Sequence, residues 1–247
     1  ELPGWDFAAV QTEAVNTWEN ELARIKVEIK DEEQKKIFYT AMYHAMIAPM
    51  LFSDVNGDYR GADDKVYNSD KPRYTCFSLW DTYRAKQPLM TIIHPEKAGD
   101  FVATMVDICD KQGDLPVWHL WGNETDCMVG DPGIPVVADA IVKGIEGFDR
   151  EAAFEAIKKT AAVEERGKEH RHKYGYIPCD IFSEAVAFDM EYAIADAAAA
   201  NAAKALGKET DYEHFTKMSH SYRTFFDKGT GFIRGVDVEG KFRTPFN

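Results

Sequence analysis

Hydrophobic residues recur at intervals of three and four along most of the chain, which is the spacing that predicts amphipathic helices. Between Ala14 and Ile25, for example, Val15, Trp18 and Leu22 keep this interval. With its caps and stops, the same pattern predicts further helices over 31–48, 78–93, 95–113, 136–145, 149–163, 183–206 and 212–226.

Local signals interrupt this helical pattern. Pro88 lies inside the 78–93 helix and predicts a break or kink there. Asn56-Gly57 within 53–59 predicts a hairpin turn, and 238–240 is expected to join strands at 231–234 and 241–243. No Gly/Ser/Pro-rich linker and no clean repeat divides the chain. Successive helices joined by aromatic and polar loops are typical of a helical toroid or array whose loops carry the site.

Composition excludes several classes of partner. Of the 247 residues, 45% are hydrophobic and 29% are charged, which is an ordinary globular balance. The net charge of −13 argues against nucleic acid and anionic membranes, since both attract basic surfaces. No apolar run approaches the roughly 20 residues that membrane insertion needs. A neutral ligand such as a sugar is compatible with this charge.

The four cysteines do not have the spacing of a metal site. Cys76, Cys109, Cys127 and Cys179 are widely separated, with no C-x-x-C motif. Free, buried thiols are the favoured interpretation and a disulfide the alternative.

The segment from Phe77 to Arg84 carries one dense group of polar and aromatic residues. Asp81 and Arg84 are one helical turn apart and could pair beside Trp80. This pattern fits a structural ion pair with a core tryptophan. It also fits a carboxylate that accepts hydrogen bonds from sugar hydroxyls next to an aromatic wall.

The segment from Leu115 to Asp131 is the most unusual in the chain. It combines two tryptophans, one histidine, one asparagine, several acids and two glycines in a poorly helical stretch. Sugar sites need apolar ring faces together with fixed donors and acceptors, and these residue types supply both. The alternative is a packed loop that braces helices, in which His119 is a hydrogen-bonded loop residue.

Other polar residues remain open to two interpretations. Asp139, Glu191 and Asp196 are acids on apolar helix faces, which either support a site or pair with an arginine. The run from His170 to His172 is predicted to be a solvated loop, since its histidines are not spaced for one helix face. Asp54-x-Asn56-x-Asp58 lacks the glycine and the bidentate acid of a calcium loop. Motifs of serine hydrolases, zincins and phosphate loops are absent from the sequence.

An ordered set of motifs resembles the catalytic domain of glycoside hydrolase family 92. The set runs nearly from end to end, and its most recognisable part is Ser78 to Arg84. The other parts are Phe38 to His44, Ser53 to Gly61, Leu115 to Trp118, Glu124-Thr125, Cys127 to Asp131, Asp139 to Gly144, Tyr174 to Pro178, Glu191 to Ala193 and Pro245-Phe246.

The resemblance implies an exo-acting, inverting, calcium-dependent α-mannosidase acting on terminal, especially α-1,2-linked, mannose of glycans. It implies an all-α fold in which residues 1–247 form a single helical domain, an incomplete portion of an (α/α)6-type toroid with small β-hairpin excursions. By the same carry-over, Trp80 walls the sugar subsite, Asp81 accepts hydroxyl hydrogens and Arg84 orients Asp81. As an extension, the pocket wall is expected to include Trp118, Glu124 and Asp131. Secretion to a bacterial periplasm or cell surface is expected from the family alone.

Two departures from the family pattern change these expectations. After Glu191 to Ala193 the chain continues with Ile194-Ala195-Asp196 in place of an aromatic residue and paired acids. The family's N-terminal β-sandwich, general acid, general base and most calcium ligands are expected outside this chain, on remaining segments of its own polypeptide. Asp81 with Glu124 is the one acid–base pair that the present residues offer. Another (α/α)6 glycosidase and a non-catalytic helical carbohydrate-binding protein are the alternative functions.

Overall fold

The computed structural model describes residues 4–246 and divides the chain into two compact units, residues 1–48 and residues 49–247. Each unit is described by itself. The single helical domain expected over residues 1–247 stays a prediction.

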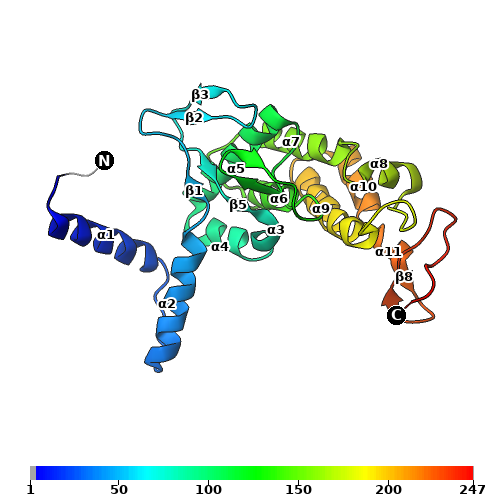
Figure 1. Ribbon diagram of the computed structural model, residues 1–247, viewed down its shortest axis with the longest axis horizontal. Coiled ribbons are helices and arrows are strands. Elements are labelled where there is room, and N and C mark those ends of the chain that lie inside the picture. Colours follow the sequence, from blue (N-terminus) through cyan, green and yellow to red (C-terminus); the bar gives the residue numbers. More distant parts are fainter. Residues whose placement is uncertain (1–3, 247) are drawn as a thin grey trace. The chain divides into compact units, whose positions relative to one another are not determined.

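The first unit contains two capped helices, α1 (Phe7–Leu22) and α2 (Glu32–Met46) (Figure 1). Asp6 accepts from the backbone N–H of the second and third residues of α1, at 3.0 and 3.1 Å. Asp31 caps α2 in the same way, as predicted. Helix α1 therefore begins well before the predicted Ala14, because the cap at Asp6 fixes its start.

Short strands open the second unit. They are β1 (Met50–Leu51), β2 (Asp58–Arg60), β3 (Val66–Asn68), β4 (Tyr74–Thr75), β5 (Phe77–Ser78), β6 (Trp118–Leu120) and β7 (Asn123–Glu124). β1 pairs with β4, β2 with β3, and β6 lies between β5 and β7, all antiparallel.

The predicted Asn56-Gly57 turn exists, but it does not join two paired strands. It precedes β2, and the reversal between β2 and β3 falls at 61–65. Gly57 has φ +88°, and a Cβ there would lie 2.3 Å from the carbonyl oxygen of Ser69. The turn is therefore fixed by close backbone approach rather than by a strand partner.

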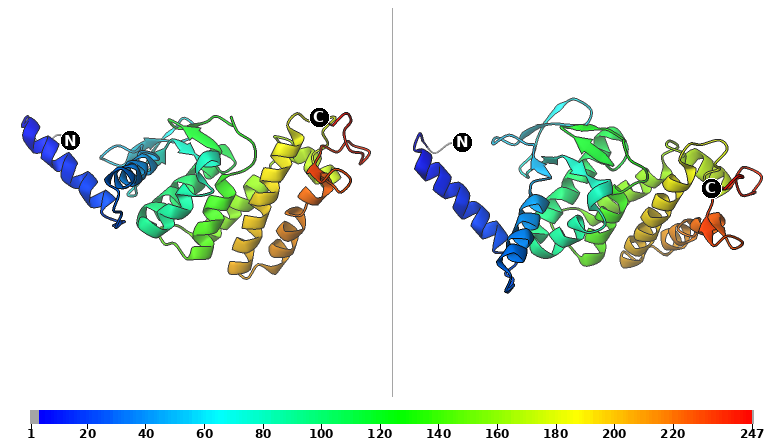
Figure 2. Two further views of the ribbon diagram at one scale, coloured as in Figure 1. Left: turned by 90° about the horizontal axis from the view of Figure 1, so that it is seen from below. Right: turned by 60° about the horizontal axis from the view of Figure 1, so that its bottom comes forward.

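Helices form the body of the second unit. They are α3 (Leu79–Thr82), α4 (Lys86–Ile93), α5 (Pro95–Gln112), α6 (Gly133–Lys143), α7 (Arg150–Ala162), α8 (Lys168–Tyr174), α9 (Ala185–Ala205), α10 (Glu209–Met218) and α11 (Tyr222–Phe225). Consecutive helices pair as α4 with α5, α6 with α7 and α9 with α10, and α6 packs between α4 and α9 (Figure 2). Such side-by-side helical hairpins confirm the predicted all-α fold as part of an (α/α)6-type toroid.

Several predicted boundaries shift for local reasons. The 78–93 helix breaks at 83–85 rather than at Pro88, which instead occupies the first turn of α4, where proline is tolerated. Helices α10 and α11 replace the single helix predicted over 212–226.

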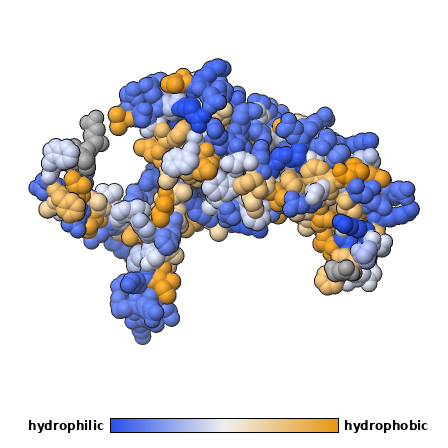
Figure 3. All heavy atoms as spheres, viewed as in Figure 1, coloured by the Kyte–Doolittle hydropathy of each residue, from blue (hydrophilic) through white to orange (hydrophobic). Residues whose placement is uncertain are grey.

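The strand predicted at 231–234 pairs with a different strand from the one predicted. β9 (Phe232–Ile233) pairs with β8 (Phe226–Asp227), while Val236 and Phe242 form one isolated bridge. Figure 3 shows hydrophobic residues gathered near these C-terminal elements, where Phe226 and Phe232 are exposed.

Helix α8 overturns the prediction of a solvated loop at His170 to His172. Arg171 is only 4% exposed. Its guanidinium pairs with Asp189 at 3.3 Å and with Asp196 at 2.7 Å, and it donates to Ser221 and to the carbonyl oxygen of Met218 at 3.0 Å. The spacing of the two histidines does not predict this helix. Its buried face carries Arg171, and the acids that pair with Arg171 lie on α9.

The two acids around Arg171 are not equivalent. Asp189 also accepts from the backbone N–H of Ile177 at 2.7 Å and from the hydroxyl of Ser221 at 2.5 Å. Asp196 has Arg171 as its hydrogen-bonding partner in this network, so burial raises its pKa from 3.8 to about 6. One arginine facing two carboxylates leaves one net negative charge, and the less well bonded carboxylate takes up the proton.

We therefore expect the stability of the protein to fall as pH rises from about 4 to about 6 through this group. In that window the folded state binds more protons than the unfolded chain does, so raising the pH favours unfolding. Besides Arg171, charged groups that act on Asp196 include Asp131 and His214. Asp196→Asn should make the unfolding midpoint less dependent on pH across this window. The exposed control Asp110→Asn should keep the wild-type dependence on pH. An unchanged slope in Asp196→Asn would contradict the assignment.

All four cysteines lie within the described residues and are free, as favoured, although only Cys109 is buried. Burial raises the pKa of the Cys109 thiol to about 11. None of the helices within residues 4–246 has the length and apolar character needed to cross a bilayer.

Candidate functional site

The Trp80-Asp81 segment is positioned by the junction of a sheet and a short helix. Ser78 ends β5 opposite Trp118 of β6, and α3 begins at the next residue. Leu79 anchors this start, since its side chain is fully buried and its backbone N–H donates to Val117 at 3.2 Å. Asp81 remains exposed and accepts a hydrogen bond from the Ser78 hydroxyl.

Arg84 does not pair with Asp81, contrary to the prediction. Its Nη2 donates to Oε1 of Glu191 at 2.8 Å, while the Tyr83 hydroxyl donates to Oε2 at 2.8 Å. The i,i+3 argument fails because α3 ends at Thr82, so Arg84 is no longer on the helix that carries Asp81.

Two aromatic rings complete the setting of Arg84. Its guanidinium carbon lies 5.2 Å from the ring centroid of Trp80 and 4.9 Å from that of Tyr83. Burial, followed by the Glu191 contact, raises the pKa of Tyr83 to about 12, so this hydroxyl stays protonated and donates. The sequence left open whether Glu191 supports a site or pairs with an arginine. It pairs with Arg84, which is itself a predicted site residue.

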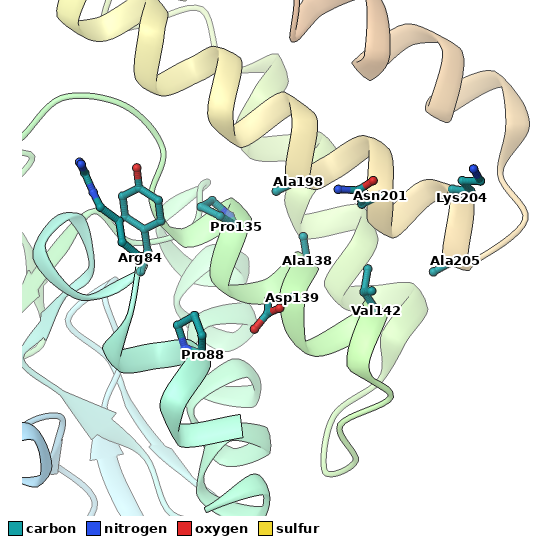
Figure 4. Close-up of a pocket in the computed structure, with 11 residues that line it drawn as sticks. Arg84, Pro88, Pro135, Ala138, Asp139, Val142, Ala198, Asn201, Lys204 and Ala205 are labelled. Atoms are coloured by element: carbon teal, nitrogen blue, oxygen red, sulfur yellow. The ribbon is translucent and has the colours of Figure 1, made fainter. Parts of the chain in front are cut away.

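A hollow of about 600 Å³ begins at this cluster and runs along α6. Figure 4 shows the residues around it, which come from the turn before α4 and from α4, α6 and α9. They include Arg84, Pro88, Pro135, Ala138, Asp139, Val142, Ala198, Asn201, Lys204 and Ala205. Its floor is built of small and apolar side chains, and Asp139 pairs with Lys143 at 2.6 Å. Polar groups therefore line the hollow along its length, from Arg84 through Asp139 to Asn201 and Lys204.

Trp118 and His119 point to opposite faces of the sheet, because side chains alternate along a strand. Trp118 lies opposite Ser78, the residue that precedes α3, and shares its face of the sheet. His119 is 2% exposed and lies 3.4 Å from the Thr75 hydroxyl through Nδ1. Burial lowers the pKa of His119 to about 4, so its imidazole is neutral at physiological pH.

Glu124 stabilises its own loop. Its carboxylate accepts four backbone N–H groups, those of Val117, Trp118 and Thr125 at 2.8 Å and that of Asp126 at 3.0 Å. Both oxygens are engaged, so Glu124 acts as a brace rather than as a partner of Asp81 in proton transfer.

Asp131 lies beneath the surface rather than in an open wall. It pairs with Lys168 at 2.9 Å, and both side chains are 4% exposed. Lys168 also donates to the carbonyl oxygen of Thr160 at 2.7 Å. Of the six predicted residues, Trp80 and Arg84 are in contact, Asp81 follows Trp80 on α3, and Trp118 lies opposite Ser78 across the sheet. Glu124 and Asp131 make supporting contacts.

The residues that hold the loop from Asp126 to Asp131, called the site loop below, were not predicted. Arg166 and Lys168 contact the loop around Asp126 to Asp131, but lie some forty residues further along the chain. Nothing in the local sequence reveals these pairings. Within the part of the chain that the structure describes, no group of three or more His, Cys, Asp or Glu side chains could hold a metal ion.

Comparisons with known proteins agree on one family. The family described as "Glycosyl hydrolase family 92 catalytic domain" matches residues 1–247. The family 92 α-mannosidase BT3965 of Bacteroides thetaiotaomicron, solved in complex with mannoimidazole, is 40% identical with a TM-score of 0.97. The family 92 inverting mannosidase BT2199 of the same organism is 30% identical with a TM-score of 0.92.

Both alignments cover 100% of this chain, but only 33% and 35% of the respective relatives. The chain therefore spans about a third of the solved structures that it matches. No match was found among curated proteins.

Proposed function

Since the chain belongs to glycoside hydrolase family 92, we propose that it forms part of the catalytic domain of an exo-acting, inverting α-mannosidase. Its substrate is a mannose-containing glycan, from which the whole enzyme removes terminal α-linked mannose, with α-1,2 linkages as the first candidate. In this proposal the chain supplies residues that bind the terminal sugar.

The observation that supports this proposal is the arrangement around Arg84. Glu191 and two aromatic rings fix the guanidinium, yet the side chain is 53% exposed. Only Nη2 is used by Glu191, so the rest of the guanidinium can donate to sugar hydroxyls. Asp81, exposed on α3, can accept hydroxyl hydrogens, and Trp80 and Trp118 supply apolar faces for the C–H side of a ring.

An inverting hydrolase needs a general acid and a general base roughly 6.5–9.5 Å apart. Glu124 is bound by its own backbone and Asp131 by a buried lysine, so neither is suited to proton transfer. We assign the acid and the base to other segments of the whole polypeptide, which are the partners of this chain. We assign the calcium ligands to those segments as well, as the family resemblance implies. Secretion to a bacterial periplasm or cell surface rests on the family alone.

Mannose release from α-1,2-linked mannobiose by the full-length protein tests the proposal. We expect release of mannose whose first-formed anomer is β, because inversion turns an α-glycoside into a β-sugar. The anomer can be followed by proton NMR before mutarotation. The α-1,2-linked glucose disaccharide is the matched control and should not be cleaved.

The outcomes separate the rival functions. Cleavage of the glucose disaccharide in preference to mannobiose would indicate another (α/α)6 glycosidase. Binding of mannobiose without hydrolysis would indicate a carbohydrate-binding protein. Turnover by residues 1–247 alone would place the proton-transfer groups within this chain and contradict the assignment above.

A further inference from the structure

Arg166, in the loop between α7 and α8, hydrogen-bonds to residues 126–130, close to the proposed sugar site. Its Nη1 donates to Asp126 at 2.5 Å. Its Nη2 donates to the carbonyl oxygen of Met128 and reaches that of Gly130 at 3.4 Å. A single side chain, 15% exposed, thus holds the loop at three points.

The other side of Arg166 is tied to α9. The Tyr192 hydroxyl donates to the carbonyl oxygen of Arg166 at 2.9 Å, and the guanidinium carbon lies 5.7 Å from the ring centroid of Phe188. Arg166 is also held at φ +55°, a left-handed conformation that non-glycine residues rarely adopt. Such a conformation persists only where the surrounding contacts impose it.

The loop that Arg166 holds lies directly against the residue that fixes Arg84. Gly130 has φ +80°, and a Cβ there would lie 2.4 Å from Cβ of Glu191. Glu191 in turn accepts from Arg84 and Tyr83. A continuous series of contacts therefore runs from Arg166 through Gly130 and Glu191 to Arg84.

We infer that Arg166 is a positioning residue, which seats the 126–130 loop on α9 and thereby fixes Glu191 and Arg84 for the terminal sugar. Its planar fork is suited to this task, because it spans a carboxylate and two carbonyl oxygens at once, which a lysine ammonium cannot do. Arg166 itself makes its contacts with protein groups rather than with substrate. The inference rests on the proposed function for its effect on turnover, but not for its effect on the loop.

The test compares Arg166→Ala, Arg166→Lys and the wild type as full-length proteins. We expect Arg166→Ala to lose on the order of 100-fold in kcat/KM for α-1,2-linked mannobiose, because a loosened support displaces the binding groups. Guanidinium ion, added far below denaturing concentrations, should restore part of this loss by refilling the vacated position. Arg166→Lys should be intermediate and insensitive to guanidinium. Arg223→Ala, which removes an exposed arginine of α11, is the matched control and should match the wild type.

Hydrogen exchange of the 126–130 amides gives a readout that is independent of activity. We expect faster exchange there in Arg166→Ala, with helix α5 unchanged. Unchanged exchange in the loop overturns the inference, whether or not the enzyme is active. So does a folded Arg166→Ala that keeps wild-type kcat/KM, or one that loses activity with no recovery by guanidinium. If the wild type releases no mannose, the proposed function and the catalytic part of the inference are overturned. Faster loop exchange in Arg166→Ala would then still support the role of Arg166 in holding the 126–130 loop.

Discussion

Replacing Asp81 with asparagine is expected to lower kcat/KM for mannose release by the full-length protein at least about 100-fold while leaving its thermal stability nearly unchanged. Asparagine keeps the shape of the side chain but replaces one acceptor oxygen by a donor and removes the charge. Two charged hydrogen bonds to sugar hydroxyls, at about 1.5–3 kcal/mol each, correspond to a loss of about 100- to 10,000-fold in kcat/KM. Initial rates on α-1,2-linked mannobiose, together with thermal unfolding, measure both effects.

The stability part of this prediction follows from the exposure of Asp81. Within the described residues Asp81 accepts a hydrogen bond from the Ser78 hydroxyl just before α3, and no arginine pairs with it. Losing such a contact at a helix start costs about 1 kcal/mol. The control is Asp110→Asn, an exposed aspartate of α5 that should change neither quantity. A large loss of stability with activity retained would assign Asp81 a structural role instead.

The helices of this chain were largely predictable, because most of them are marked by local capping and stop residues. Asp31 and Asp149 cap helices where the sequence places them, and Gly113 ends α5 at φ +117°. The boundaries that moved depend on contacts between distant segments. The strand that pairs with β9 is an example, since it begins immediately after α11 rather than beyond residue 240.

The pairings within the candidate site were not predictable from the sequence, and the sugar-binding role of its residues stays a prediction. Trp80, Asp81 and Arg84 were identified as a group, yet Arg84 pairs with Glu191, more than one hundred residues away. Spacing along a helix cannot reveal such a partner once the helix ends at Thr82. Glu124 and Asp131 show the converse, since acids in an unusual loop can serve the loop itself.

The cations of the 166–171 segment show why the remaining contacts escaped prediction. Arg166, Lys168 and Arg171 neutralise acids of the site loop, of the start of α6 and of α9, respectively. In the sequence they look like an ordinary charged stretch. Their role is visible only when the fold brings the acids of three other segments to them.

Arg171→Met is expected to destabilise the protein by about 3–5 kcal/mol, the range found when one partner of a buried ion pair is removed. Methionine approximates the length of the side chain but leaves Asp189 and Asp196 buried, at 0% and 5% exposure, without a cation. The Ser221 hydroxyl and the carbonyl oxygen of Met218 also lose their donor. Urea denaturation at neutral pH, followed by a probe of this helical unit, gives the change in the free energy of unfolding.

The cause of the loss can be isolated by adding a second substitution. Arg223→Met removes an exposed arginine from α11 and should change the free energy of unfolding by no more than about 0.5 kcal/mol. Arg171→Met combined with Asp196→Asn should recover part of the loss, because one of the two unpaired carboxylates is then neutral. Lowering the pH toward 5 should help Arg171→Met more than the double variant, since Asp196 can take up a proton only in the former. If Arg171→Met costs no more than Arg223→Met, the buried network around Arg171 does not stabilise the packing of α8 against α9.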